Sequence, residues 1–134
     1  MQALARIHSY HAHVYYDPAR TRDAAEALRS RIGERFLVQL GRWHDVPVGP
    51  HTAAMYQVAF GTELFAAFVP WLMLNRDGLD VLVHPNTRAP RDDHLRHALW
   101  LGRALALKEE ALPLQADAAA EPPVVPNTQP GLAP

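Results

Sequence analysis

The chain has no cysteine, no long apolar run and no block of charges of one sign. Without thiols it has neither a disulfide framework nor thiolate chemistry, so any metal would need nitrogen or oxygen ligands. No apolar run approaches the roughly 20 residues that span a bilayer, and the first six residues lack the pattern of a signal peptide. These absences predict a cytoplasmic protein with no membrane partner.

The charges are nearly balanced, with 13 basic and 14 acidic residues. A basic face for nucleic acid is therefore not expected. Of the 134 residues, 49% are hydrophobic, which is enough for one domain with its own core. We predict this domain over residues 1–112. Residues 113–134 are rich in proline and alanine and have no apolar period, which predicts a tail that is disordered or loosely docked.

Apolar periodicity and turn residues predict an alternation of strands and helices. Helix starts are expected at Asp17–Pro18, at Thr62 and at Asp92 or Asp93, and the last helix is expected to run to about Leu112. Strands are predicted at residues 7–16, 36–41, 53–60 and 79–84.

This β-α-β-β-α-β order, followed by a helix, is that of an α+β domain of the ferredoxin-like class. The expected sheet order is 4-1-3-2, with the crossover helices on one face. The first and third strands are expected to be parallel neighbours, and the second face of the sheet is expected to be open.

Two histidines, His11 and His13, stand two residues apart in the first predicted strand. Alternate side chains of a strand share a face, so both imidazoles should project with Ser9 and Tyr15 from the open face. Two imidazoles that point the same way suggest a metal site. The alternative is an ordinary half-buried strand, because a single His-x-His pattern is a weak signal.

Two further histidines strengthen the metal hypothesis. His51 precedes the third strand and His84 ends the fourth, so the predicted topology brings both to the beginning of the first strand, near His11. His13 would lie one step further along. Several imidazoles from separate segments suit a first-row divalent ion. An all-histidine set is favoured over a set with one carboxylate, for which Asp80 is the candidate.

A three-ligand site needs fewer than four histidines, so one of them, such as His13, could instead orient substrate or transfer protons. His94 lies at the start of the last predicted helix. It is either a surface residue of the capping region or an acid/base that reaches back to the site. Arg42, Arg88 and Arg91 could bind a substrate carboxylate, although each could also be a solvated surface residue.

The histidine-bearing segments together resemble one known family. They are Tyr-His-Ala-His-Val-Tyr-Tyr at 10–16, Gly-Pro-His at 49–51, Tyr-Gln-Val-Ala-Phe at 56–60, Val-Leu-Val-His-Pro-Asn-Thr at 81–87, Asp-His at 93–94 and Trp-Leu-Gly at 100–102. In this order they resemble the DOPA 4,5-dioxygenase family over about residues 7–103. Arg88-Ala89 departs from the pattern, in which a glycine is expected near that turn.

The resemblance implies extradiol cleavage of a catechol, such as DOPA, with non-haem Fe(II) and O2. It implies that His11, His13, His51 and His84 supply the metal ligands and their immediate surroundings. His94, and also His13, are then the candidates for acid/base catalysis. Zinc could replace iron in a purified sample. A homodimer is a further expectation for so small a domain.

A second hypothesis belongs to another functional class. The chain could be a non-catalytic ferredoxin-like module whose open sheet face binds a ligand or a second copy. Its histidines would then be structural, and it would neither retain a metal nor consume oxygen.

Overall fold

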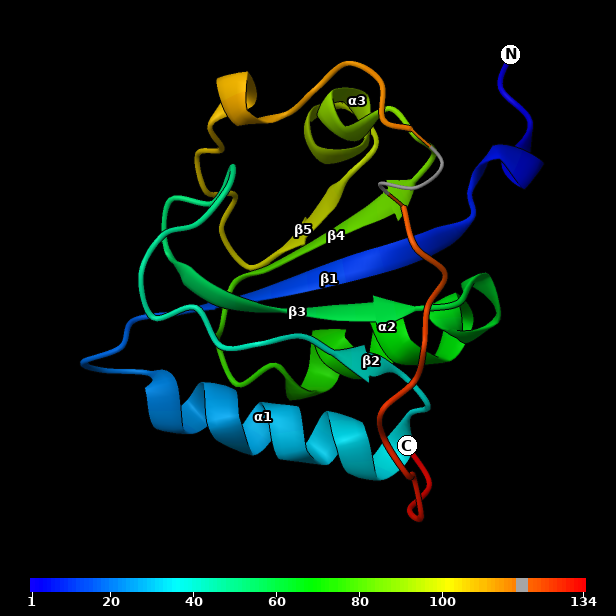
Figure 1. Ribbon diagram of the computed structural model, residues 1–134. Helices are drawn as coiled ribbons and strands as arrows, with labels where there is room; N and C mark the ends of the chain where they lie inside the picture. The colour runs from blue at the N-terminus through cyan, green and yellow to red at the C-terminus, as the bar shows by residue number, and fades with distance from the viewer. Residues whose placement is uncertain (118–120) are drawn as a thin grey trace.

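A five-stranded antiparallel sheet forms the centre of the protein in a computed structural model, which describes residues 1–117 and 121–134. The strand order is β2-β3-β1-β4-β5 (Figure 1). The strands are β1 (Ser9–Tyr16), β2 (Gln39–Leu40), β3 (Ala54–Phe60), β4 (Val81–Asn86) and β5 (Leu99–Leu101). The α-helices are α1 (Arg22–Arg35), α2 (Phe65–Asn75) and α3 (Pro90–Leu95), and short 3₁₀ helices lie at η1 (Leu4–Arg6), η2 (Thr62–Leu64) and η3 (Glu109–Ala111).

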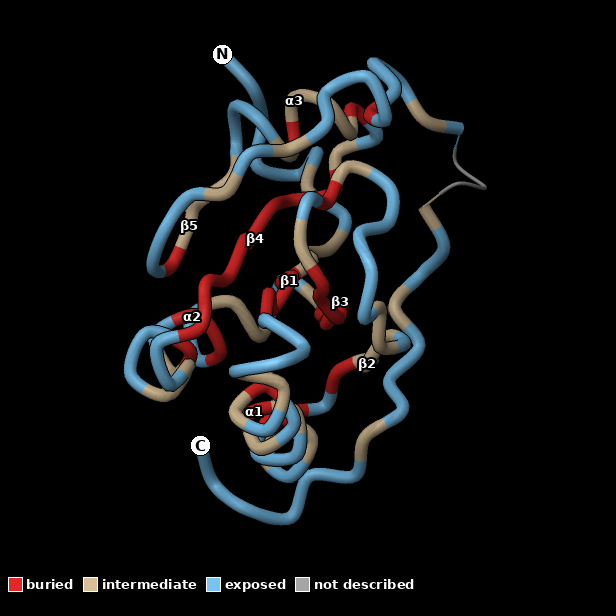
Figure 2. Tube along the Cα trace, turned by 90° about the vertical axis from the view of Figure 1, so that its left-hand side faces the viewer, coloured by how far each residue is buried: buried red, intermediate tan, exposed pale blue. Residues whose placement is uncertain are grey.

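The predicted α+β, ferredoxin-like arrangement is confirmed, because the first four strands lie in the order 4-1-3-2 with α1 and α2 on one face of the sheet. The core lies between that face and the two helices. Ala12, Val14 and Tyr16 alternate along β1 toward the helices and are buried, as the strand period requires. Leu28 of α1 and Phe68 of α2 are fully buried in the same core. Figure 2 shows buried positions along both helices and the central strands.

The prediction that the first and third strands are parallel was wrong. β3 pairs antiparallel with both β1 and β2. The physical reason is the connection: α1 carries the chain back so that β2 runs parallel to β1, and β3 returns between them. Tyr16 at the end of β1 therefore lies opposite Ala54 at the beginning of β3.

The last predicted helix is also shorter than expected, because α3 ends at Leu95 and a strand follows. β5 pairs with β4, with Leu101 opposite Val81. Leu99 and Leu101 pack on the core under the helices, whereas Trp100 packs on the other face. This alternation has the period of a strand, and it prevails over the helical spacing that the sequence suggested.

The first helix begins later than predicted. Asp17 does not cap α1; its carboxylate accepts a hydrogen bond from the Ala19 amide within a turn, and α1 starts at Arg22. The second helix is preceded by η2 and contains Pro70. Gly78 has φ +75°, the left-handed conformation expected after this helix.

The second face of the sheet is not open, contrary to expectation. α3, the segment around His51 and the connecting segment 102–117 lie over it (Figure 1). His13 and His84 on this face are only 3% and 1% exposed. The histidine side of the sheet is therefore a second, smaller interior.

The tail was expected to be disordered or loosely docked, and in the structure residues 125–128 lie along β2 (Figure 1). The Asn127 side chain bonds both the amide and the carbonyl of Leu40, at 2.8 and 2.9 Å. The Thr128 hydroxyl accepts from the Val38 amide and donates to the Phe36 carbonyl. These contacts cover the edge of the sheet, which would otherwise present unpaired backbone groups. Residues 118–120 of the predicted tail lie outside the described residues.

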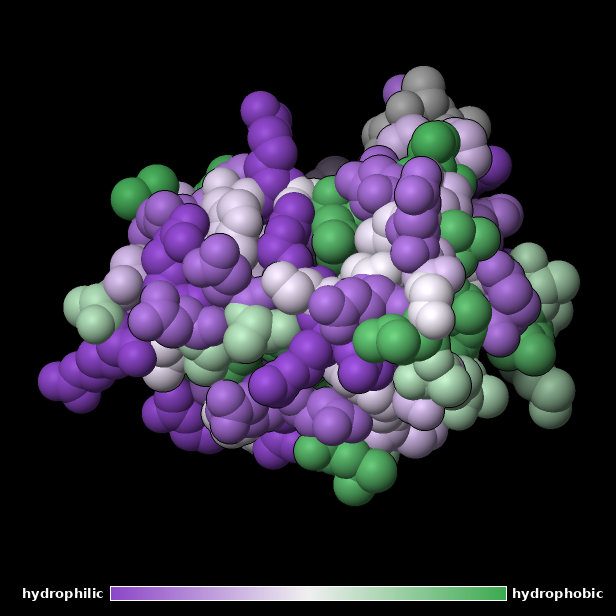
Figure 3. All heavy atoms as spheres, turned by 90° about the horizontal axis from the view of Figure 1, so that it is seen from below, coloured by the Kyte–Doolittle hydropathy of each residue, from purple (hydrophilic) through white to green (hydrophobic). Residues whose placement is uncertain are grey.

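The outer side of the α1 layer is predominantly hydrophilic (Figure 3). Within the described part of the chain, none of the helices has the length and apolar character that a membrane crossing requires.

Thr128 provides a test of how the tail is held. Thr128→Val keeps the shape of the side chain but leaves the Val38 amide without its acceptor. We expect the free energy of unfolding to fall by about 1 kcal/mol and proteolysis within the tail to accelerate. Urea unfolding and limited proteolysis measure the two effects. Gln129→Ala, at an exposed neighbouring position, is the control, and equal behaviour of both variants would contradict the docking.

Candidate metal centre

Three imidazoles meet on the covered face of the sheet. β1 contributes His11 and His13, which alternate onto this face, and the register of β4 places His84 directly opposite His11. One ring nitrogen from each of the three lies within 4.8 Å of the other two. The pairing of β1 with β4 therefore brings together three of the four predicted ligands.

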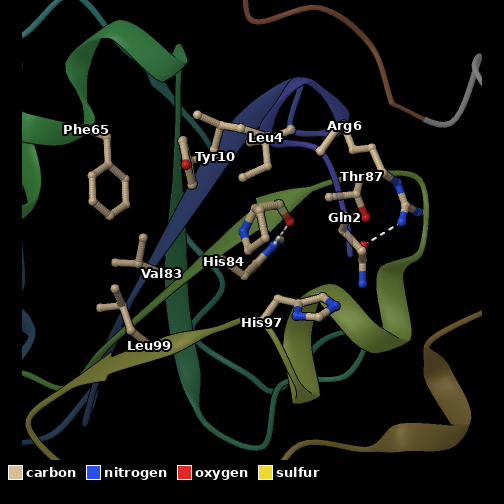
Figure 4. Close-up of a pocket in the computed structure, with 13 residues that line it drawn as sticks. Gln2, Leu4, Arg6, Tyr10, Phe65, Val83, His84, Thr87, His97 and Leu99 are labelled. Carbon is tan, nitrogen blue, oxygen red and sulfur yellow. Dashed lines mark hydrogen bonds between the residues drawn. The ribbon is translucent and has the colours of Figure 1, made fainter.

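The nitrogens of His13 and His84 face each other, with 3.1 Å between the two Nε2 atoms. Nδ1 of His84 lies 2.9 Å from the Pro85 carbonyl oxygen (Figure 4). Because a carbonyl can only accept, the proton of neutral His84 is on Nδ1, and Nε2 presents a lone pair toward His13.

This arrangement fits a metal ion. Two nitrogens bound to one ion at about 2.1 Å, at 90–109° to each other, would be about 3.0–3.4 Å apart. The buried Nδ1 of His13 has no hydrogen-bond partner among the described residues in either tautomer. When the proton of neutral His13 is on Nδ1, the Nε2 lone pairs of His13 and His84 face each other, and a cation between them would replace this repulsion with two bonds.

His94 of α3 lies beside the cluster. Of the two positions that the sequence left open, on the surface or at the site, it occupies the second. Its ring centre lies 3.8 Å from that of His84. Its Nδ1 lies 2.7 Å from the Pro90 carbonyl, so Nδ1 carries the proton and Nε2 has a free lone pair. The His94 side chain is a partly buried neighbour of the three-histidine group rather than a capping residue on the surface.

His51 also reaches the cluster, but from the opposite direction to the one expected. Because β3 is antiparallel to β1, His51 lies near the end of β1, and its ring centre is 4.3 Å from that of His13. The Tyr15 hydroxyl lies 2.7 Å from His51 Nδ1. The pairing of His51 with Leu107 holds the loop in place. His51 is thus beside His13, outside the group of three.

The cluster is electrically neutral at pH 7. Burial, followed by repulsion from His94, lowers the pKa of His11 to about 4, and burial likewise lowers the pKa of His51 to about 4. Burial also holds the pKa values of His13 and His84 well below the ordinary range, and it lowers that of His94. Neutral imidazoles are the form that ligates metals.

The carboxylates considered for a mixed ligand set are occupied elsewhere. Asp80 accepts hydrogen bonds from the amide and guanidinium of Arg103. Asp93 is 1% exposed and accepts from the amide and hydroxyl of Thr87 at 2.8 and 2.5 Å. The geometry around the cluster is therefore that of an all-histidine set.

A cavity of about 460 Å³ opens beside three of the histidines. His11, His84 and His94 line its inner end, and amide side chains from β2, β3 and β4 line its wall, namely Gln39, Gln57 and Asn86. A second cavity, of about 370 Å³, lies between η1, α2 and β5 and is largely apolar (Figure 4). Of the cluster, only His84 borders this second cavity, so the first is the candidate substrate site.

Sequence reasoning missed Tyr15 as a functional candidate. Its ring stacks on Trp100 and its hydroxyl holds His51, while burial raises its pKa. The signal was present in the alternation of β1, which places Tyr15 on the face of His11 and His13. The hydrogen bond to His51 depended on the antiparallel register, which was predicted incorrectly.

Residues 10–111 match the Dopa 4,5-dioxygenase family. The chain belongs to this family. The resemblance drawn from the motifs is thereby confirmed, and it covers the segments that carry all five histidines of the cluster.

Two curated relatives come from fungi. The chain is 36% identical over 110 residues to an uncharacterized 21.2 kDa protein of Botryotinia fuckeliana, and 32% identical over 121 residues to the DOPA 4,5-dioxygenase of Amanita muscaria. These alignments cover 75% and 84% of this chain but 58% and 53% of the relatives. The chain thus spans little more than half the length of the curated relatives it matches.

A solved structure agrees in fold. The crystal structure of a proposed dioxygenase from Nostoc punctiforme matches with a TM-score of 0.81 and 54% sequence identity. The match covers 83% of this chain and 96% of the other.

The buried neutral histidines predict acid sensitivity of the metal-free protein. The unfolded chain takes up protons on these residues below about pH 6.5, whereas folded His11 and His51 do so only near pH 4. Stability is therefore full above pH 6.5 and is lost as the pH falls toward 4. Between pH 7.5 and 5 we expect a loss of about 2 kcal/mol for each of these two groups, from about 1.4 kcal/mol per pKa unit.

Urea unfolding at the two pH values measures the loss. His51→Gln should reduce the difference, whereas His97→Gln, at an exposed position outside the cluster, should leave it unchanged. Equal stability of the metal-free protein at pH 7.5 and 5 would refute the neutral cluster.

Proposed function

We propose that the protein is an extradiol ring-cleaving dioxygenase that acts on a catechol with non-haem Fe(II) and O2. The observation that carries this proposal is the convergence of His11, His13 and His84, whose ligand nitrogens lie within 4.8 Å of one another inside a dioxygenase family fold. The name of the Amanita muscaria relative supports a catechol as the substrate class.

In this proposal His11, His13 and His84 hold the metal through one nitrogen each. A bound Fe(II) ion supplies the redox chemistry with O2 and stabilises the catecholate anion. Three protein ligands leave coordination positions free for substrate and oxygen. Of the two roles that the sequence left to His13, ligation is the one that its short approach to His84 favours.

The two flanking histidines are suited to proton transfer. His94 borders the cavity and its Nε2 is an unprotonated acceptor, so it is placed to take a proton from a catechol hydroxyl. His51 shares a proton with the Tyr15 hydroxyl across 2.7 Å, and this pair can return a proton on the other side of His13.

The cavity contributes orientation and exclusion of water. Its volume of about 460 Å³ is within the range of small-molecule sites. Pro90, Pro113 and Pro122 lie along its lining and present no amide hydrogen to a substrate. The neutral amides of Gln57 and Asn86 can donate to a ring substituent.

The non-catalytic module is the second candidate, and no specific observation favours it. The face that would have bound a partner is covered, and His13 and His84 on it are almost fully buried. A homodimer and a cytoplasmic location stay predictions.

Metal content and ring opening test the proposal together. Anaerobic reconstitution with Fe(II), followed by a catechol and O2, should give a yellow semialdehyde with one O2 consumed per catechol. Identification of the product fixes the ring position. If the protein retains no metal and gives no product with any catechol tried, the enzyme assignment is wrong.

Histidine variants separate the roles. His84→Ala should lower iron affinity by about 100-fold or more, because it removes a ligand. His51→Ala and His94→Ala should keep the iron and lower kcat by about 10²- to 10⁴-fold, the usual contribution of acid/base catalysis. His97→Ala is the control for both measurements. Wild-type iron content in His84→Ala would contradict its role as a ligand.

A further inference from the structure

The cavity beside the histidines is closed by the tail rather than by the sheet alone. Its outer lining includes Ala116, Glu121 and Val124, all of which lie beyond the residues that match the family. The substituent of a catechol whose diol faces the histidines would point toward this part of the wall. The tail is therefore placed to determine which catechols fit.

Two acidic residues, Asp93 and Glu121, line this cavity. Both oxygens of Asp93 accept hydrogen bonds from Thr87, whereas only one oxygen of Glu121 is anchored. Oε1 accepts a 2.7 Å hydrogen bond from the Arg88 amide, and the Arg88 carbonyl accepts from the Ala116 amide at 2.9 Å. Arg88 has φ +68°, at the turn where the family pattern has glycine. The tail thus bonds both the amide and the carbonyl of Arg88. These bonds to the β4–α3 turn fix the position of the Glu121 side chain.

The second oxygen of Glu121 lacks a partner. Oε2 is buried, and among the described residues no donor lies within hydrogen-bonding distance of it. A carboxylate oxygen removed from water without a donor is unfavourable. A ligand that brings a cationic donor to this oxygen would relieve the cost with a charge-assisted hydrogen bond.

Away from the histidines, the described lining of the cavity offers no cationic side chain to a negative substituent. In the described part of the chain, neither arginine nor lysine is among the lining residues. The arginines considered for a substrate carboxylate are absent from this lining: Arg88 borders a neighbouring cavity, which Glu121 also borders, and Arg91 bonds the Leu112 carbonyl.

Resting on the proposed function, we propose that Glu121 binds an ammonium group on the substrate, so that the preferred substrates are catechols with a cationic amine side chain. Catechols with a carboxylate side chain are disfavoured, because they meet Glu121 and find no cation. An amino-acid catechol satisfies Glu121 through its ammonium group and leaves its carboxylate unpaired.

A matched set of 4-substituted catechols tests this specificity. The set is 3,4-dihydroxyphenethylamine, 4-ethylcatechol and 3-(3,4-dihydroxyphenyl)propanoate, which differ chiefly in the charge of the side chain. For the iron-loaded wild type, kcat/KM should fall in that order. Glu121→Gln keeps an oxygen that can accept from the Arg88 amide and removes the charge.

Glu121→Gln should lower the ratio of kcat/KM for the amine to that for the propanoate by about tenfold or more, the range of one charge-assisted bond. Turnover of 4-ethylcatechol should change by less than about twofold. Glu26→Gln, at an exposed position of α1 on the other side of the sheet, should leave the ratio unchanged. A ratio in Glu121→Gln equal to that of wild type would overturn the inference.

A binding measurement separates this inference from the proposed function. Calorimetry of the amine and the propanoate on zinc-loaded protein, without oxygen, needs no turnover. If the protein binds the amine more tightly than the propanoate, if Glu121→Gln abolishes this preference, and if no catechol is opened, the ammonium site is supported and the dioxygenase is refuted. Ring opening of 4-ethylcatechol, together with amine binding that does not depend on Glu121, would support the dioxygenase and refute the ammonium site.

Discussion

The antiparallel pairing of β1 with β4 is the constraint on which the site depends. It sets His84 opposite His11 and diagonal to His13, so a slip of one residue would turn one strand's imidazoles to the helix side. The register is fixed by the opposite face, where Ala12 and Val14 of β1 and Val83 of β4 are buried under the helices. The core therefore holds the histidines in place, although its residues lie on the opposite face of the sheet.

Burial of this histidine face then determines its electrostatics. α3 and the long connections exclude water, which lowers the pKa values of the clustered imidazoles and keeps their lone pairs available. Backbone carbonyls of Pro85 and Pro90 fix the tautomers of His84 and His94, and Tyr15 orients His51. Such fixed imidazoles with unpaired nitrogens are costly in the absence of a cation, and this cost is the reason to expect one. The tail closes the remaining opening and adds the single acidic wall residue with an unpartnered oxygen.

The order of strands and helices followed from periodicity and turn residues, and so did the shared face of His11, His13 and Tyr15. The direction of β3 did not follow, because the connections between two strands decide how they pair. The parallel prediction put His51 near His11, whereas it lies beside His13.

Other features left no clear pattern in the sequence. β5 was not recognised because Leu95, Leu99 and Trp100 also fit a helical spacing. The tail was hidden because Asn127 and Thr128 dock through backbone hydrogen bonds, which leave no hydrophobic pattern. His94 joins the cluster through tertiary packing alone.

X-ray absorption at the iron edge of anaerobically Fe(II)-loaded protein measures the central claim most directly, since it reports the atoms bound to the metal. We predict one iron per chain with three imidazole ligands at about 2.1 Å, visible through the outer-shell scattering of the rings. The ring contribution should fall to two imidazoles, or the iron should be lost, when His84 is replaced by alanine. An iron environment of oxygen atoms without imidazole scattering would contradict the account.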